Sequence, residues 1–352
     1  ALLVATCPCA LSLATPTALT AATGSLHKLG LLLTRGHVLD GLNQIDTVIF
    51  DKTGTLTEGR LTLREIRPLG EHSADHCLGL AAALENRSEH PIARAFGRAP
   101  WAAEQVDSHP GLGLEGVVNG QRLRIGQPAF VAALSNTPAL TIPGDQGQWL
   151  LLGDEHAPLA WLVLDDRLRS DAPALIDACR ARGWQILLLS GDSSPMVAQV
   201  AEQLGISDAR GGLTPADKLA VLQQLHSQQR KVLMLGDGVN DVPVLAAADI
   251  SVAMGSATDL AKTSADAVLL SNRLDSLVQA FALAKRTRRI ITENLAWACL
   301  YNGLILPFAA LGWVTPIWAA LGMSLSSLLV VLNALRLIRT QVQAPQTPAP
   351  AI

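Results

Sequence analysis

Three short apolar runs of this chain each end in a loop that contains aspartate. Val48-Ile49-Phe50 leads to Asp51, the run after Trp184 leads to Ser-Gly-Asp192, and the run after Lys231 leads to Gly-Asp-Gly-Val-Asn-Asp241. Helical patterns cover residues 171–182, before the second run, and residues 196–204, between the second and the third. Strands that alternate with helices predict a doubly wound parallel sheet. Because the carboxyl ends of parallel strands share one edge, we expect the three loops to meet in one crevice.

Longer apolar stretches predict membrane-spanning helices. Residues 1–26 hold no charged side chain, and Glu293 is the last charged residue before Arg336. About 20 apolar residues are enough to cross a bilayer. The second stretch is long enough to cross twice, with Gly312-Trp-Val-Thr-Pro316 as the turn. We therefore expect one spanning helix in residues 1–35 and two in residues 288–338.

Composition and charge agree with a membrane protein. A mean hydropathy of +0.30 is too apolar for a wholly soluble chain, so a lipid bilayer is an expected partner. A net charge of -3 excludes a generally basic surface, and we expect no nucleic-acid partner. The positive-inside rule places both ends of the second stretch, and the three aspartate-containing loops, in the cytosol. The cations flanking that stretch are Lys285, Arg286, Arg288 and Arg289 before it, and Arg336 and Arg339 after it.

The stretch Asp46-Thr-Val-Ile-Phe-Asp-Lys-Thr-Gly-Thr-Leu-Thr57 places a carboxylate at the end of a buried strand. A carboxylate in that position can attack a phosphoryl group and form an aspartyl phosphate. Lys52 would offset the phosphate charge, and the backbone N–H groups of Thr53-Gly54-Thr55 could curl around it. A lone Asp in such a turn is more often structural. The full string favours chemistry at Asp51.

The segment Cys7-Pro8-Cys9 lies within the first apolar stretch. A proline inside a helix removes a backbone hydrogen bond and breaks the helix, which is tolerated in membranes where the break lines a site. Soft thiolates favour Cu(I), Zn and similar ions. One cysteine in a membrane helix is more often a small apolar filler, but two at this spacing predict a metal site.

These motifs carry a resemblance to a known family. Asp51-Lys-Thr-Gly-Thr-Leu-Thr57 is identical to the phosphorylation motif of P-type cation-transporting ATPases, and residues 1 to about 339 resemble their heavy-metal, copper(I) branch. The Cys-Pro-Cys segment resembles the transport-site signature of that branch. The following Thr15-Pro-Thr-Ala-Leu-Thr leans toward the subgroup that supplies copper to an oxidase.

The resemblance implies a domain plan. Residues 45–62 and 160–275 would form a doubly wound parallel-sheet (HAD-like) phosphorylation domain, in the α/β class. Residues 63–159 would form an inserted α+β nucleotide-binding domain, and residues 340–352 a disordered tail. No Thr-Gly-Glu actuator motif is present, so we expect the natural protein to continue upstream of Ala1.

In this plan the phosphorylation domain would bind Mg²⁺ and a phosphoryl group. Asp51, Asp237 and the Thr53 carbonyl would hold Mg²⁺, which prefers oxygen ligands. Lys218 would neutralise phosphoryl oxygens, and Ser190 and Gly191 would donate hydrogen bonds to them. Asn240 and Asp241 would hold the metal loop or its water. The expected catalytic set is Asp51, Lys52, Thr53, Ser190, Gly191, Asp192, Lys218, Asp237, Asn240 and Asp241.

The inserted domain contains Ser-Glu-His-Pro91 followed by glycine pairs. By resemblance, Glu85 and His90 would contact the adenine of ATP. Three glycines would let the nucleotide approach the backbone: Gly111, Gly113 and Gly126. Gln127 departs from the Asn that usually follows the last of them.

The later membrane helices complete the expected Cu(I) site. Tyr301-Asn302 in the first and Met323-Ser-Leu-Ser-Ser327 in the second match the companion patterns of the copper(I) branch. Zinc and cadmium relatives typically place an acidic residue in the last helix, and none is present here. Packing for Met323 and helix–helix hydrogen bonding for Ser326 and Ser327 are the alternatives. The expected ligands are Cys7, Cys9, Tyr301, Asn302, Met323 and Ser327.

The favoured hypothesis is ATP-driven export of Cu(I) across a bacterial inner or plasma membrane, with a copper chaperone as a further partner. Soluble phosphatases of the superfamily carry a second Asp, two residues after the nucleophile, as general acid and base. Thr53 occupies that position here, so the acyl phosphate should persist. The alternatives are a membrane-anchored phosphatase or phosphotransferase, a transporter of Ag(I) or Zn(II), and a copper-binding membrane protein without enzyme activity.

Overall fold

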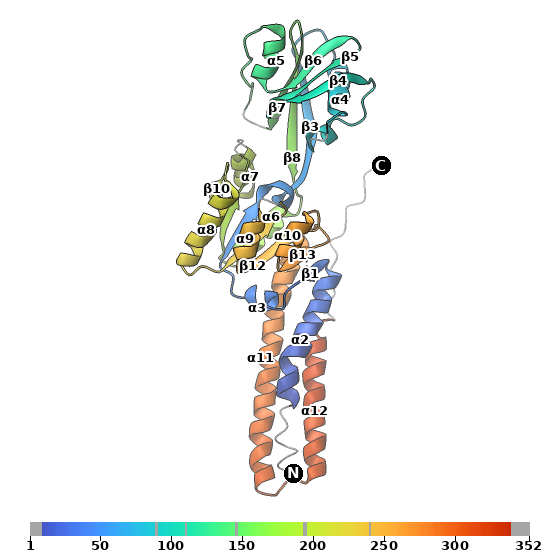
Figure 1. Ribbon diagram of the computed structural model, residues 1–352. Helices are drawn as coiled ribbons and strands as arrows, with labels where there is room; N and C mark the ends of the chain where they lie inside the picture. The colour runs from blue at the N-terminus through green and yellow to red at the C-terminus, as the bar shows by residue number, and fades with distance from the viewer. Residues whose placement is uncertain are drawn as a thin grey trace. The chain divides into compact units, whose positions relative to one another are not determined.

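The computed structural model describes residues 9–88, 91–109, 111–144, 147–192, 196–238 and 241–338. The chain forms two compact units. The first comprises Ala1–Ile49, Pro173–Ile186 and Ala216–Ile352, and the second Phe50–Ala172 and Leu187–Pro215. Figure 1 labels the elements in chain order.

A seven-stranded, mostly parallel sheet carries the Asp51 strand. β9 pairs in parallel with β10, β11 with β12, and β12 with β13, while β1 is an antiparallel edge strand. Every residue of β2 and β11 is buried, as expected for a sheet covered on both faces. The predicted doubly wound sheet is confirmed. In spatial order the strands are β1 (Leu31–Leu33), β13 (Ala267–Leu269), β12 (Ile250–Met254), β11 (Val232–Gly236), β2 (Thr47–Asp51), β9 (Gln185–Leu189) and β10 (Asp208–Arg210).

Short helices connect these strands. In α7 (Met196–Leu204) the buried residues include Met196, Val200 and Leu204, which are spaced at one helical turn and form a single apolar face. This helix occupies the predicted residues, whereas the helix predicted over 171–182 is shorter. The others are α3 (Val38–Gly41), α6 (Ala172–Arg180), α8 (Pro215–Ser227), α9 (Val242–Ala247) and α10 (Asp259–Ser264).

The inserted region is an antiparallel six-stranded sheet with helices, which confirms its α+β class. On one side α4 (Ala74–Glu85) packs Leu80 and Leu84 into a buried apolar core of the sheet. A second core joins α5 (Pro128–Ser135) to Trp149 and Trp161. The short turn η2 spans Pro91–Ala95. In spatial order the strands are β3 (Thr57–Pro68), β8 (Pro158–Leu168), β7 (Gln148–Asp154), β6 (Gln121–Gly126), β5 (Gly113–Val118) and β4 (Ala103–His109).

The passage into the inserted region is a pair of strands. The boundary predicted at residues 62 and 63 falls inside β3, and the one at 159 and 160 falls inside β8. The two strands pair antiparallel from Thr57↔Leu168 to Pro68↔Ala160, with irregular register between Thr57 and Leu61. Glu58-Gly-Arg60 lie in this irregular part, where no residue of β8 is their register partner.

Three long helices belong to the first unit: α2 (Cys9–Lys28), α11 (Asp275–Ala310) and α12 (Pro316–Leu335). They run alongside one another in Figure 1, and Ala10, Ala14, Ala298 and Val330 pack where they meet. Small residues allow such close helix contacts. Among the described residues, α12 is the helix long and apolar enough to cross a membrane.

The predicted bounds of these helices need correction. The cation-rich residues 285–289 continue the helix rather than precede it, so α11 begins at Asp275 and not at 288. The first helix ends at Lys28, and after two intervening residues β1 begins at Leu31 and pairs antiparallel with β13. The predicted tail, residues 340–352, lies outside the described residues.

Candidate active site and metal site

Strand β2 and the turn that follows it present Asp51. The Asp51 side chain is buried at 6% exposure, and the chain then turns back through η1 (Lys52–Leu56). Gly54 has a φ of 73°, in the left-handed region that favours glycine. The turn closes when the Thr57 N–H donates to the Lys52 carbonyl. A Lys/Thr/Gly-rich sequence thus forms a wide loop directly after the carboxylate.

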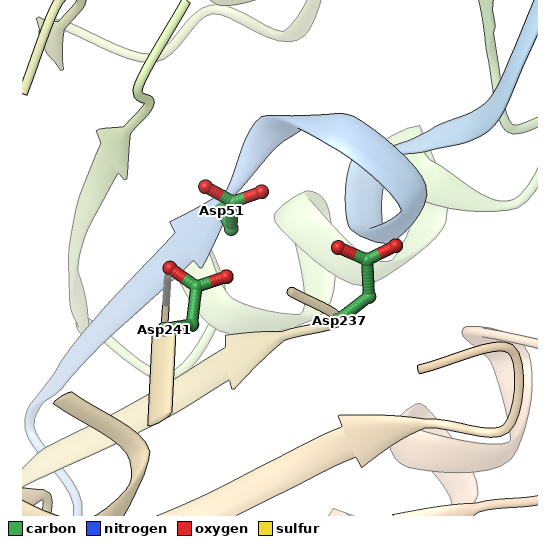
Figure 2. Close-up of side chains that lie close together, drawn as sticks. All are labelled: Asp51, Asp237 and Asp241. Atoms are coloured by element: carbon green, nitrogen blue, oxygen red, sulfur yellow. The ribbon is translucent and has the colours of Figure 1, made fainter. Parts of the chain in front are cut away.

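Three carboxylates gather at the end of β2. One oxygen each from Asp51, Asp237 and Asp241 lies within 4.8 Å of the others, and Figure 2 shows the three side chains pointing into a common space. Carboxylates this close repel one another unless a cation or a proton offsets their charge, so the cluster could hold a metal ion. Oxygen donors in this number suit Mg²⁺. Asn240 lies outside the described residues, and the metal-binding role of the Thr53 carbonyl stays a prediction.

Lys218 and Asp241 form a buried ion pair beside this cluster. Lys218 Nζ is 2.7 Å from Asp241 Oδ1, and the two side chains are 3% and 2% exposed. The sequence predicted that Lys218 would reach a phosphoryl group. In the structure its charge is balanced by a carboxylate of the cluster, so Lys218 helps to hold three acids together.

Lys52 is paired with the end of a different strand. Its Nζ lies 2.5 Å from Asp192 Oδ2, while the Asp192 N–H donates to Ser190 Oγ at 3.1 Å. Ser190 is buried, and Gly191 is exposed. The predicted phosphate cation therefore has a carboxylate partner, and the Ser190-Gly191-Asp192 loop positions that partner.

Two residues that the sequence reasoning missed fix the loop after Asp51. Arg169 donates from Nη2 to the Gly54 carbonyl at 2.9 Å and from Nε to the Thr55 carbonyl at 3.0 Å. Asp166 accepts from Thr57 Oγ1 at 2.5 Å, and burial raises the pKa of its carboxyl group. The only sequence signal was a charged cluster, Asp165-Asp-Arg-Leu-Arg169, at the end of an apolar strand.

A pocket of about 780 Å³ adjoins this loop within the second unit. Lys52, Arg60 and Arg94 line it, so its wall is rich in cations. The side chains of Asp166 and Asp192 are also present. Arg94 and Gln148 come from the inserted region, so the pocket extends from that region to the residues following Asp51. Its size and charge suit an anionic ligand such as a nucleotide.

The predicted nucleotide glycines have a local structural reason. Gly113 and Gly126 face each other across β5 and β6, each with φ of 152°. A Cβ on Gly113 would lie 2.1 Å from the Ile125 carbonyl, and one on Gly126 would lie 2.1 Å from the Leu112 carbonyl. Close backbone approach therefore demands both glycines. Gly111 has φ of 75° and accepts from Gln127 Nε2 at 2.7 Å, which gives Gln127 a role in holding the loop.

Glu85 ends α4 with an unusually buried carboxyl group. Its side chain is 5% exposed, and burial raises its pKa to about 7. Near neutral pH this group can be protonated and can donate a hydrogen bond, as a base-recognition site requires. His90 lies outside the described residues, so the expected adenine contacts of both residues stay predictions.

The raised pKa of Glu85 predicts a pH-dependent stability. The folded chain binds this proton more tightly than the unfolded chain, whose pKa is near 4.5, so stability is full below 4.5 and falls as pH rises toward 7. The free energy of unfolding of the unchanged chain should fall by on the order of 3 kcal/mol between pH 4.5 and about 7, and Glu85→Gln should abolish this fall. Urea unfolding without nucleotide, repeated across this pH range, measures the difference. Glu104→Gln, an exposed change in the same region, is the control. An unchanged pH profile in Glu85→Gln would contradict the assignment.

The long helices bring together part of the predicted metal site. Cys9 Sγ of α2 lies 3.9 Å from Met323 Sδ of α12. The Tyr301 hydroxyl of α11 is buried and has no hydrogen-bond partner among the described residues. Asn302 and Ser327 are half-buried. Two sulfur atoms and an unsatisfied hydroxyl fit a soft metal ion.

Two qualifications of the predicted set follow from the structure. Cys7 lies outside the described residues. A metal ion needs the thiolate of Cys9, so binding requires the reduced cysteine. Ser326 accepts a hydrogen bond from Trp297 Nε1 at 3.1 Å, so helix–helix hydrogen bonding holds for this serine.

Comparison with known proteins decides the family. A family profile described as haloacid dehalogenase-like hydrolase matches residues 45–249, more than half of the chain. The chain belongs to the haloacid dehalogenase-like hydrolases. Asp51 of this hydrolase thus stands at the end of the first strand inside the matched region.

Relatives of this hydrolase include P-type ATPases. It is 41% identical over 341 residues to the nitrogen fixation protein FixI of Rhizobium leguminosarum bv. viciae, covering 96% of the chain and 44% of that protein. It is 38% identical over 357 residues to a probable copper-exporting P-type ATPase V of Mycobacterium tuberculosis (strain ATCC 25618 / H37Rv), covering 96% and 46%. The chain therefore spans about half the length of these relatives.

Solved structures agree. A zinc-transporting PIB-type ATPase in the E2.Pi state matches this hydrolase with a TM-score of 0.80 and 36% identity, over 95% of the chain and 56% of that protein. The catalytic domain of the CPx-ATPase CopB-B matches with a TM-score of 0.61 and 28% identity, over 74% and 98%. The resemblance to heavy-metal P-type ATPases is confirmed by these matches, which include both copper-exporting and zinc-transporting proteins.

Proposed function

We propose that this chain carries the catalytic part of a P-type ATPase that uses ATP to move a soft metal cation, foremost Cu(I), across a membrane. The observation that carries the proposal is the gathering of Asp51, Asp237 and Asp241 beyond a buried parallel strand. Asp51 lies where a nucleophile must lie, and its two partners can hold the cation that phosphoryl transfer requires.

In the proposed reaction an Asp51 carboxylate oxygen attacks the γ-phosphorus of ATP. The bond from that phosphorus to the β,γ-bridging oxygen breaks, and ADP leaves with the electron pair. Mg²⁺, held by Asp51 and Asp237, would supply charge neutralisation at the phosphoryl oxygens. Lys52 and Arg94 line a pocket that reaches the residues after Asp51 from the inserted region. These cations would orient the phosphate chain of the nucleotide.

The proposed cargo follows from the donor atoms in the long helices. Cys9 and Met323 offer soft sulfur, and α12 contains no acidic residue. Sulfur donors favour Cu(I), whereas the zinc-transporting relative leaves Zn(II) as the second candidate. The cationic residues around α11 and α12 favour a cytosolic catalytic part.

Labelling with γ-³²P-ATP and Mg²⁺ tests the proposal. We expect an acid-stable label that hydroxylamine removes, since an acyl phosphate is cleaved by that nucleophile. Competition with a chromophoric Cu(I) chelator in detergent, under reducing conditions, tests the cargo, with Zn(II) measured in parallel. Absence of label, or binding of Zn(II) but not Cu(I), would contradict the corresponding part.

Thr53 predicts a long-lived phosphoenzyme. Its side chain is exposed and lines the pocket beside Lys52, but a hydroxyl cannot act as general base at neutral pH. Thr53→Asp should therefore shorten the lifetime of the label by about 100-fold or more, as positioned acid–base groups accelerate reactions to that extent. The measurement is a chase with unlabelled ATP.

The isosteric variant Thr53→Asn is the control, because it adds a similar shape without a titratable group. Equal lifetimes in Thr53→Asp and Thr53→Asn would contradict the role given to this position. Rapid turnover of small phosphoesters by the unchanged chain would instead favour the phosphatase alternative.

A further inference from the structure

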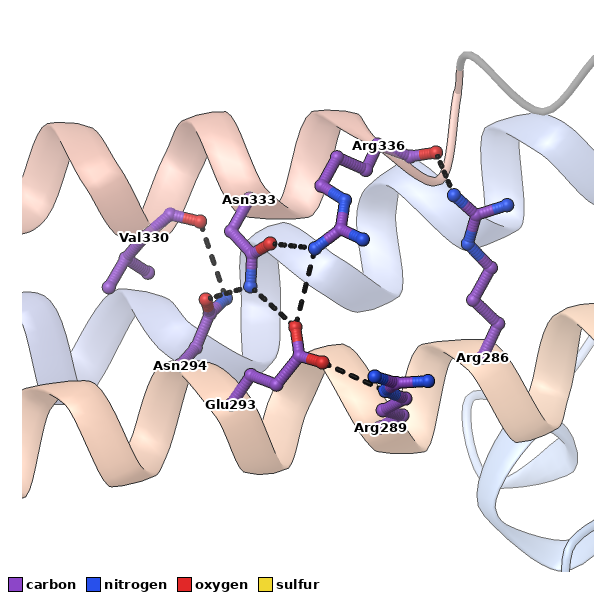
Figure 3. A network of polar contacts seen from close by, with 7 residues as sticks. All are labelled: Arg286, Arg289, Glu293, Asn294, Val330, Asn333 and Arg336. Carbon is purple, nitrogen blue, oxygen red and sulfur yellow. Dashed lines mark hydrogen bonds and ion pairs between the residues drawn. The ribbon is translucent and has the colours of Figure 1, made fainter.

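Two asparagines, the buried Asn294 and the half-buried Asn333, join α11 to α12 through a polar cluster (Figure 3). Asn333 Nδ2 donates to Asn294 Oδ1 at 2.9 Å and to Glu293 Oε2 at 3.2 Å. Asn294, at 2% exposure, donates from Nδ2 to the Val330 carbonyl at 3.3 Å. Asn333 Oδ1 accepts from Arg336 Nη1 at 2.8 Å. Both ends of each amide group are therefore satisfied, by bonds across the helix pair and by Arg336 at the end of α12 itself.

A ladder of contacts leads from this cluster to the proposed metal site. Trp297 Nε1 donates to Ser326 Oγ, and the Tyr301 hydroxyl lies against Gly322, where an added Cβ would be 2.7 Å from the Tyr301 oxygen. The three successive pairs are Asn294–Val330, Trp297–Ser326 and Tyr301–Gly322. From one pair to the next, the position moves three or four residues forward along α11 and four residues back along α12. This is the spacing of one face on each of two antiparallel helices. The last step places Tyr301 against Gly322, which directly precedes Met323 in α12.

The helix pair is restrained at its two ends by different means. The turn at residues 311–315 joins the helices at one end, and the amide pair lies toward the other. The exposed side chains between them are largely Leu, Ile and Ala, which lipid solvates as readily as a neighbouring helix does. An amide pair between two helices favours one alignment, because any other alignment leaves amide groups unpaired, here including the buried Asn294.

We propose that Asn294 and Asn333 are positioning residues for the metal site, whose identity rests on the proposed function. Their hydrogen bond holds α12 against α11 and so keeps Met323 aligned with Tyr301. Neither asparagine contacts the metal. The role is to preserve the distance between donor atoms contributed by two separate helices.

The double variant Asn294→Leu/Asn333→Leu tests this role, because it removes the hydrogen bond and leaves neither amide unpaired. We expect its Cu(I) affinity, measured by chelator competition, to fall about 10- to 100-fold, as happens when groups that orient metal ligands are lost. The number of ions bound at saturation should not change. A merely destabilising change would lower that number instead. Ser324→Ala is the matched control, because its hydroxyl donates to the Ala320 carbonyl within α12.

A second readout does not depend on metal. Cysteines introduced as Trp297→Cys and Ser326→Cys, with Cys299→Ser, report helix contact through the yield of a maleimide cross-link mapped by mass spectrometry. The yield should fall several-fold in the double leucine variant and stay unchanged in Ser324→Ala. Unchanged affinity or unchanged cross-linking in the double variant would overturn the positioning role. If the unchanged chain did not bind Cu(I), the proposed cargo would be wrong. The cross-linking yield would still test whether the two asparagines hold α11 and α12 in alignment.

Discussion

Replacement of Asp51 by asparagine will remove the label that γ-³²P-ATP leaves on the chain, by roughly 10,000-fold or more, because the amide cannot attack phosphorus and nucleophile losses are of at least that size. Asp51 is buried at the end of β2 and shares its space with Asp237 and Asp241. The measurement is acid-quenched labelling followed by mass spectrometry of the modified peptide.

Asp46→Asn is the matched control for this change. Asp46 directly precedes the same strand, where its Oδ1 accepts from Thr47 Oγ1 at 2.7 Å, and it lies at the opposite end from the carboxylate cluster. Its labelling should stay within about 2-fold of the unchanged chain, as expected for a carboxylate outside the reaction. If the ³²P label persisted in Asp51→Asn, another residue would accept the phosphoryl group, and the assignment of Asp51 as the nucleophile would be wrong.

Lys218→Met will lower the free energy of unfolding by about 3–5 kcal/mol, since removal of one partner leaves a buried charge without compensation. Lys218 and Asp241 are both almost fully buried. Urea unfolding monitored by circular dichroism measures the loss. Addition of Asp241→Asn should restore much of the stability but not the activity, because it removes the stranded charge and also a member of the carboxylate cluster.

Lys231→Met supplies the comparison for a lysine pair at the surface. Lys231 Nζ is 2.8 Å from Asp249 Oδ1, nearly the same separation, but the lysine side chain is 52% exposed. Water screens this pair, so its loss should change stability little. Similar losses in Lys218→Met and Lys231→Met would show that burial does not set the value of the pair.

The sequence predicted those features that depend on local pattern. Val48-Ile49-Phe50 and the run after Lys231 are apolar and bounded by polar residues, so their strands and the parallel sheet could be expected. Parallel strands end at one edge, which is why Asp51 and Asp237 could be expected to meet. The helix of residues 196–204 followed from its apolar spacing.

Contacts between distant side chains could not be read in this way. The partner of Lys52 is Asp192, 140 residues away in sequence, and no periodicity relates the two. Arg169 reaches carbonyl groups of the Asp51 loop only because β8 runs back beside β3. The start of α11 was misplaced because membrane hydropathy marks where a helix meets lipid, and the helix itself begins earlier, at Asp275.

The short junction between α2 and β1 limits how the proposed metal helix can move. Leu29 and Gly30 alone separate the end of α2 from a strand hydrogen-bonded to β13, and two residues can span at most about 7 Å when extended. A translation of α2 along its own axis, which would carry Cys9 with it, is limited by the length of this junction. A larger translation would break the hydrogen bonds between β1 and β13. A tilt of α2 about the junction needs neither a longer junction nor the loss of the β1–β13 pairing. The junction therefore favours tilting of α2 over translation along its axis.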